Sequence, residues 1–334
     1  MARYFLLDLN YASFHGRKPV NIQRSFFLVV LAFCFVGANA SAQTLAPQIE
    51  QSRQYDSVGV SSLPPNETSN HSPMPVFAPE SPGDEDLGQQ IILKTKNVYQ
   101  PLTVFLGTDL SYTSNVGLSE GNEQEDWISR TTLSAIYAPR FGNYLQGNIS
   151  ISQDVFRYDK FDELNFESLN LGAGLTYNLW FLYGVNAHLV FNYNRLTSEG
   201  YGDEIFSNRS LSFSLSRNFI LSRAHYFYVA SGVELGWSDP EQAARDEFTL
   251  LTGYHVRLAR NFEIDILYRL GFYHYTEVDR EDVNHTFQLT ARYNFTKWLS
   301  VNASLNASFN ESDRTGFDYE AINTGVGAFV SWKF

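Results

Sequence analysis

The segment Leu299-Ser-Val-Asn-Ala-Ser-Leu-Asn-Ala-Ser-Phe309 switches between apolar and polar side chains at every residue. Successive side chains of a β-strand point to opposite faces, so this run predicts a strand with one apolar and one polar face. The same alternation recurs in residues 185–193, 211–216 and 287–295. In total, twelve such segments follow one another between residue 100 and the end of the chain.

The length of these segments favours a membrane barrel over a soluble β-sandwich. A tilted strand that crosses a bilayer needs about 9–11 residues, whereas strands of soluble proteins usually have about five or six. The alternating segments reach the longer value. We therefore expect an all-β fold, in which residues 98–334 form a transmembrane antiparallel up-and-down β-barrel of about 12 strands.

The connections between the segments differ in length and charge. Short connections are predicted near residues 139–143, 179–183, 218–223, 259–261 and 296–297, and long ones near 115–126, 159–163, 197–206, 238–247, 277–283 and 310–320. The long connections hold 22 acidic and four basic residues. Short periplasmic turns and longer extracellular loops are typical of outer-membrane barrels, which predicts that both ends of the barrel chain lie in the periplasm. We interpret the acidic loops as solvated surface, with cation-mediated contact to lipopolysaccharide as the alternative.

The composition excludes several other classes of protein. Aromatic residues make up 16% of the chain and charged residues 18%, and the formal net charge is −12. A nucleic-acid partner is therefore not expected, because phosphate binding requires clustered Lys and Arg. The single cysteine excludes a disulfide framework and a multi-cysteine zinc site, and no cofactor or metal is expected.

The N-terminal part of the chain predicts export. Residues 26–36 are apolar throughout, follow a basic stretch and precede a run of small residues with Ala-x-Ala spacing. This order is typical of a secretory signal peptide, here residues 1–42, and it places Cys34 in the segment that is removed. Residues 43–97 are rich in proline and polar side chains, which predicts a disordered periplasmic linker. A plug for the barrel, or a handle for a periplasmic partner, is the alternative.

The last segment is apolar at every second position and ends with Trp332-Lys-Phe334. This ending resembles the C-terminal signal of bacterial outer-membrane barrels, in which the barrel-assembly machinery recognises the final Phe. The first hairpin, with Leu110-Ser-Tyr-Thr-Ser-Asn-Val116, an acidic loop and then Asp126-Trp-Ile-Ser129, resembles members of a β-barrel porin family over about thirty residues. The resemblance implies an outer-membrane barrel, and some members of that family accompany exopolysaccharide systems.

The alternation also predicts which charged side chains face the lumen. The candidate lumen or constriction residues are His255, Arg257, Glu263, Asp265, Arg269 and Arg292, with Asp109 and Arg130 as a second, smaller pair. All but Arg269 of the first group are expected near the periplasmic end. Such a set either forms a salt-bridge network that closes the lumen or forms a constriction that selects ions and small solutes.

We expect no enzyme and no catalytic residues, because His274 and His285 near the loop rim form the only plausible acid–base pair. The leading hypothesis is an outer-membrane channel or porin that passes small solutes or ions through a polar lumen. The first alternative is a closed-lumen anchor or exopolysaccharide-export partner, and the second is a loop-rim hydrolase. Expected partners are outer-membrane lipids, lipopolysaccharide, the barrel-assembly machinery and a periplasmic partner that binds residues 43–97.

Overall fold

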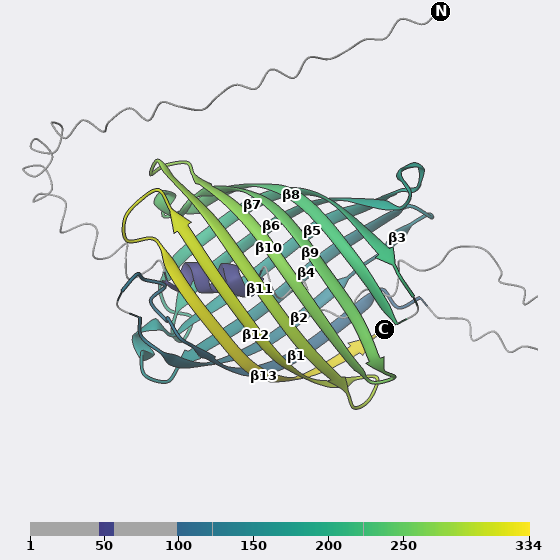
Figure 1. Ribbon diagram of the computed structural model, residues 1–334, viewed down its shortest axis with the longest axis horizontal. Coiled ribbons are helices and arrows are strands. Elements are labelled where there is room, and N and C mark those ends of the chain that lie inside the picture. Colours follow the sequence, from purple (N-terminus) through teal and green to yellow (C-terminus); the bar gives the residue numbers. More distant parts are fainter. Residues whose placement is uncertain (1–46, 57–98, 122, 223) are drawn as a thin grey trace, which may run out of the picture. The chain divides into compact units, whose positions relative to one another are not determined.

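The computed structural model describes residues 47–56, 99–121, 123–222 and 224–334. Twelve strands form a closed antiparallel barrel, and a two-residue strand, β3, extends one turn (Figure 1). The strands are β1 (Leu102–Thr113), β2 (Asp126–Tyr137), β3 (Arg140–Phe141), β4 (Leu145–Tyr158), β5 (Phe166–Leu179), β6 (Val185–Ser198), β7 (Glu204–Ile220), β8 (His225–Asp239), β9 (Arg245–Ala259), β10 (Phe262–Tyr275), β11 (Arg280–Asn294), β12 (Leu299–Ser312) and β13 (Tyr319–Lys333). The predicted strand number and up-and-down order are confirmed.

The first and last strands close the barrel. Strand β1 pairs with β13 from Thr103↔Lys333 to Thr113↔Asn323. The amide of Phe334 donates a hydrogen bond to the Leu102 carbonyl oxygen (2.8 Å), and the amide of Leu102 donates one to the Phe334 carbonyl oxygen (3.2 Å). Closure leaves no sheet edge whose backbone groups would lie unpaired in lipid.

The outer face of the barrel is apolar along most strands. Leu, Val, Phe and Ile side chains such as Leu133, Ile149, Phe213 and Phe287 are 46–58% exposed. An exposed apolar surface that runs around the whole barrel has no stable place in water, because burial of each such side chain in lipid is worth about 1.5–3 kcal/mol. The outer face is therefore the lipid-facing surface, as the alternation predicted.

The connections fall into two groups, one at each end of the barrel. We call the end with the β1–β2, β4–β5, β6–β7, β8–β9, β10–β11 and β12–β13 connections the loop end, and the other, which also holds Leu102 and Phe334, the turn end. The predicted difference in length is wrong for several loops, because β6 and β7 leave only residues 199–203 between them and β10 and β11 leave only 276–279. Backbone pairing continues there beyond the point where the apolar and polar side chains cease to alternate.

Residues 47–56 form a helix, which lies within the barrel near the loop end (Figure 1). The prediction of a disordered periplasmic linker over residues 43–97 is therefore wrong for this stretch, because contacts with the barrel wall order it. The predicted signal peptide of residues 1–42, with Cys34, and residues 57–97 of the linker lie outside the described residues. Among the helices of the described ranges, none is long and apolar enough to cross a membrane.

Candidate functional site: the lumen and its helix

The helix at residues 47–56, which we call the lumen helix, depends on the barrel for its stability. Pro47 occupies the first turn, where its missing N–H costs nothing, and Glu50 and Arg53 lie 4.0 Å apart on adjacent turns. Isolated helices shorter than about 12–15 residues are marginal in water, so this one requires tertiary contacts. Ile49, Gln51 and Ser52 are all more than nine-tenths buried, which shows that the barrel wall supplies these tertiary contacts.

An apolar surface on the inward face of the barrel receives the lumen helix. Ile49 packs into a buried cluster whose wall members are Val116, Ile128, Phe156, Tyr158, Phe166, Leu196 and Phe206. Phe156 and Phe166 stack with ring centroids 4.3 Å apart, and Tyr55 of the helix lies 5.2 Å from the Phe156 ring. We call Ile128, Phe156, Phe166, Leu196 and Phe206 the apolar seat. Without the helix, the side chains of the apolar seat would be exposed to water in the lumen, so they require an apolar partner.

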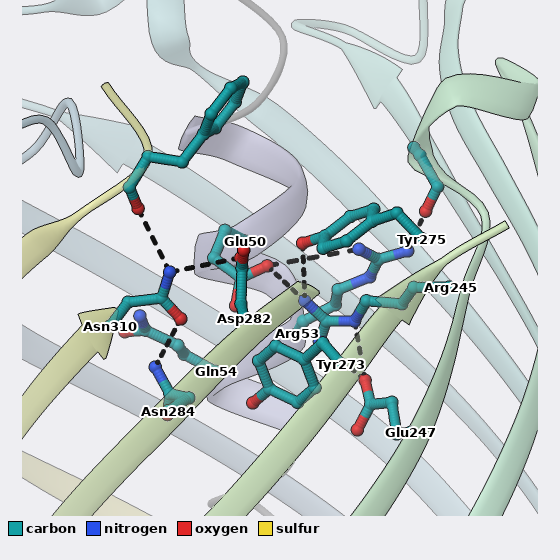
Figure 2. Close-up of polar contacts among 12 residues, drawn as sticks. Glu50, Arg53, Gln54, Arg245, Glu247, Tyr273, Tyr275, Asp282, Asn284 and Asn310 are labelled. Carbon is teal, nitrogen blue, oxygen red and sulfur yellow. Dashed lines mark hydrogen bonds and ion pairs between the residues drawn. The ribbon is translucent and has the colours of Figure 1, made fainter. Parts of the chain in front are cut away.

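A buried charged cluster holds the other side of the lumen helix (Figure 2). Nη1 of Arg245 lies 2.7 Å from Oε2 of Glu50, and its Nη2 lies 2.6 Å from Oε1 of Glu247. The Arg245 guanidinium also lies 4.0 Å from the centre of the Tyr273 ring, and the side chain is 5% exposed. Arg269 donates to the second Glu247 oxygen at 2.9 Å. Buried charges of this kind require full pairing, and Glu50 of the helix provides part of it.

Further polar contacts join the lumen helix to the barrel wall and loops. Gln48 Nε2 donates to the Leu164 carbonyl oxygen (3.0 Å), and Arg53 Nη2 donates to the Ala243 carbonyl oxygen (2.8 Å). The helix also contacts three strands through the pairs Ser52–Ser168, Gln54–Tyr319 and Tyr55–Ser111, at 3.5, 3.2 and 2.9 Å. These contacts involve several strands and two loops at the loop end, so the lumen helix occupies the entrance of the lumen there.

A second charged cluster lies inside the barrel toward the turn end. His255 Nδ1 lies 2.7 Å from Asp265 Oδ1, and its Nε2 lies 3.8 Å from Glu263 Oε2. Arg292 lies 3.4 Å from the other Glu263 oxygen. The structure thus brings together four of the residues that parity assigned to this part of the lumen. Arg257 is exposed and forms no ion pair with any residue in the described ranges.

The other predicted lumen residues, the Asp109–Arg130 pair and Arg269, lie farther from the turn end than this second cluster. Arg130 Nη2 and Asp109 Oδ1 form an ion pair at 2.8 Å, and the Arg130 guanidinium lies 4.6 Å from the Tyr55 ring of the lumen helix. Arg269 belongs to the cluster that binds the helix, through Glu247. Arg130 thus contacts the lumen helix directly, whereas Arg269 is connected to it through Glu247 and Arg245.

A cavity of about 80 Å³ lies between the lumen helix and the wall formed by β11, β12, β13, β1 and β2. Its lining is mainly carboxamide and hydroxyl side chains, with one aromatic ring from the wall and one from the helix. The lining includes Gln54, Tyr55, Ser111, Gln288, Thr290, Asn302, Ser304, Asn306, Asn323 and Phe329, together with the Asp109–Arg130 pair. The lumen therefore retains polar space beside the helix.

Several acidic residues of the predicted loops are buried rather than solvated. Asp126 is fully buried and accepts hydrogen bonds from the amides of Lys160 and Phe161 at 3.0 and 3.2 Å. Asp282 is 2% exposed and pairs with Arg280. The interpretation of the loop acids as a solvated surface is thus wrong for these two positions. Both residues lie near the loop end of a strand, Asp126 in β2 and Asp282 in β11, where their side chains are buried.

In contrast to Asp126 and Asp282, the acidic residue Glu125 is exposed at the loop end of the barrel. Tyr112 donates a hydrogen bond to Glu125 at 2.6 Å, and Lys160 lies 3.3 Å from the same carboxylate. These two donors, Tyr112 first, hold the pKa of Glu125 below its usual value.

The two candidate acid–base histidines are not brought together. His274 pairs across β10 and β11 with Glu281, whereas His285 lies opposite Leu270, so they are four register positions apart. His274 is exposed on the outer surface, and His285 contacts the Tyr268 hydroxyl at 2.9 Å. Among the described residues, no group of three or more His, Cys, Asp or Glu side chains is arranged to hold a metal ion.

The fold has counterparts among solved structures. The COG4313 outer membrane channel from Pseudomonas putida F1 aligns with a TM-score of 0.52 at 10% identity, over 70% of this chain and 97% of that one. This chain therefore shares the closed antiparallel barrel fold of that structure. The KdgM porin in complex with disordered oligogalacturonate (TM-score 0.40, 13% identity, 69% of this chain and 99% of that one) and an anion-selective porin from Comamonas acidovorans (0.37, 10%, 70% and 99%) align less closely. No protein-family model and no curated protein matches the sequence.

Proposed function

We propose that this protein is an outer-membrane channel for small polar solutes or ions, and that the lumen helix is an internal plug at the loop end. The observation that carries the proposal is the pairing of a polar, partly hollow lumen with a separate helix at its entrance. Barrels of eight strands are filled by their own side chains, whereas twelve strands enclose a wider space. Here a segment from outside the barrel fills part of that space.

The plug is held by contacts that allow release. Ile49 and Tyr55 supply its apolar packing, and cation–π contacts join Arg53 to Phe206 and Arg130 to Tyr55. The remaining contacts are hydrogen bonds and ion pairs that water can replace. In addition, neither the oxygen nor the nitrogen of the Gln51 carboxamide has a hydrogen-bond partner among the described residues, although the side chain is fully buried. An unpaired buried polar group costs about 1–3 kcal/mol, which reduces the net stability of the docked helix.

Planar-bilayer recording on the purified protein tests this proposal. The full chain is compared with a variant that lacks residues 43–56 and retains the rest of the sequence. The variant is expected to conduct steadily, and the full chain to conduct rarely or in short openings. Absence of current from both proteins, with folded barrels confirmed by circular dichroism, would refute the channel.

The second candidate function is a closed-lumen anchor or export partner, and the lumen helix itself favours it. In that case the helix is a permanent filler, and the deletion variant is expected to lose stability without gaining conductance. We also propose cleavage of the signal peptide after Ala40 or Ala42, with residues 57–97 available to a periplasmic partner. Contacts with lipopolysaccharide and recognition of Phe334 by the assembly machinery belong to the same proposal, and it includes no covalent chemistry.

A further inference from the structure

The cavity beside the lumen helix combines features that solute binding requires. It lies against the inward faces of β11 to β13, and the helix closes one side with Gln54 and Tyr55. Three of its carboxamides, those of Gln288, Asn306 and Asn323, have an oxygen that is buried and lacks a hydrogen-bond partner among the described residues. Gln288 is only 7% exposed, and its Nε2 already donates to Thr290 Oγ1 at 3.1 Å.

Unpaired amide groups that line one cavity indicate the chemistry of the molecule that fits there. A buried polar atom without a partner is costly, so native sites of this kind are completed by water or by a ligand. A carboxamide can be turned so that either its oxygen or its nitrogen is the unpaired atom. The best complement is therefore a group that both donates and accepts hydrogen bonds, which is the property of a hydroxyl.

The charge of the cavity argues against an ionic ligand. Asp109 and Arg130 are the charged residues in the described lining, and they neutralise each other at 2.8 Å. No unbalanced charge is left to attract a phosphate, a carboxylate or a cation. The lining thus favours an uncharged molecule over an ion of the same size.

Two aromatic rings give the cavity apolar faces. Phe329 stacks on Phe105 with centroids 5.3 Å apart, and a Cβ on Gly107 would lie 2.3 Å from the Phe329 ring, so glycine at position 107 makes room for it. Tyr55 lies on the helix side, with its hydroxyl at 2.9 Å from Ser111. Carbon-bound hydrogens of a polyol can pack on such rings while its hydroxyls bond to the amides.

We infer that this carboxamide cavity is a binding site for a small uncharged polyol, contacted by Gln288, Asn306 and Asn323 and bordered by Tyr55 and Phe329. The inference rests on the proposed function, for which it names the class of solute. A volume of about 80 Å³ restricts the ligand to a molecule with few non-hydrogen atoms, and a three-carbon polyol such as glycerol is of this size.

Saturation-transfer NMR on the detergent-solubilised full chain tests the site with glycerol as the probe. Glycerate serves as a charged probe of similar size. The expected result is a saturable signal from glycerol and a much weaker one from glycerate. Because binding is measured at equilibrium without a membrane, the result does not depend on whether the barrel conducts.

Variants locate the binding. Gln288→Leu and Asn306→Leu each remove one polar contact and are expected to raise the dissociation constant for glycerol about tenfold, the effect of one hydrogen bond near 1.4 kcal/mol. Asn192→Leu, on the lumen face of β6 and outside the cavity lining, is the matched control and should leave binding unchanged. Equal binding by all three variants, or no saturable signal in the unaltered chain, would overturn the inference, and a stronger glycerate signal would replace the polyol by an anion.

Discussion

Glu50 of the lumen helix and Arg245 of β9 form a buried ion pair, with Oε2 and Nη1 2.7 Å apart. The pair joins a segment that precedes the barrel to a strand almost two hundred residues later in the chain. Arg245 keeps a second partner in Glu247, so the pair can open without leaving the arginine alone. This arrangement is suited to a contact that forms when the helix docks and breaks when it leaves.

Glu50→Gln is expected to weaken docking of the lumen helix. The substitution removes the charge but keeps the shape, and loss of a hydrogen bond to a charged group costs about 1–3 kcal/mol. The docked fraction should fall, so openings in planar bilayers become more frequent, and amide hydrogen exchange in residues 47–56 becomes faster. Glu311→Gln, at an exposed position of β12, is the control. Unchanged exchange in Glu50→Gln would show that the ion pair does not hold the helix.

A disulfide between the helix and the wall is expected to lock the lumen. The hydroxyl oxygens of Ser52 and Ser168 lie 3.5 Å apart, which brings their side chains within reach of a disulfide. The only native cysteine is Cys34, in the predicted signal peptide, so the double variant Ser52→Cys/Ser168→Cys has no competing thiol after cleavage. Conductance should be abolished under oxidising conditions and return with a reductant.

The single variants Ser52→Cys and Ser168→Cys control for the substitutions themselves and should not respond to the reductant. The crosslink in the oxidised double variant is verified by mass spectrometry. If this crosslinked protein still conducts like the unaltered chain, solutes pass beside the docked helix. The lumen helix would then be a constriction rather than a plug.

Charge inside the turn end is expected to influence ion selectivity. Arg292 is 6% exposed and faces the lumen next to Glu263, so Arg292→Gln leaves the local charge more negative. In the variant that lacks residues 43–56, the reversal potential in a salt gradient should move toward the cation potential. Arg217→Gln removes the same charge near the same end, but Arg217 lies against Tyr183 and Phe219, both exposed on the outer surface. Equal shifts in both variants would exclude a local effect of Arg292.

The barrel could be predicted because its signal is local and repeated. Alternation in segments such as residues 299–309 identifies the strands, and its parity assigned His255, Glu263 and Arg292 to the lumen. In the structure these three side chains are buried. The ends of the strands could not be found in the same way. Beyond the lipid both faces of a strand are polar, so the alternation ends while the backbone pairing continues.

The lumen helix could not be predicted from its own residues. It contains only two large apolar side chains, Ile49 and Tyr55, and the surrounding sequence is rich in proline. Its order comes from the barrel wall, which is distant in the sequence. One signal was available, because Phe156, Phe166 and Phe206 fall on the face that parity assigns to the lumen, where large apolar residues require a partner.

The chain terminus offers a test that separates assembly from stability. Phe334 is 62% exposed on the outside of the turn end, and Phe295, at the β11–β12 turn of the same end, is 60% exposed. Removing either ring loses a similar lipid contact, so Phe334→Ala and Phe295→Ala should refold equally well into liposomes. The amount of folded barrel in cell membranes is measured by heat-modifiable mobility on gels. If the assembly machinery recognises the final Phe, this amount should fall severalfold in Phe334→Ala and not in Phe295→Ala. Equal amounts of the two variants in cells would indicate that Phe334 acts only as a lipid-facing side chain.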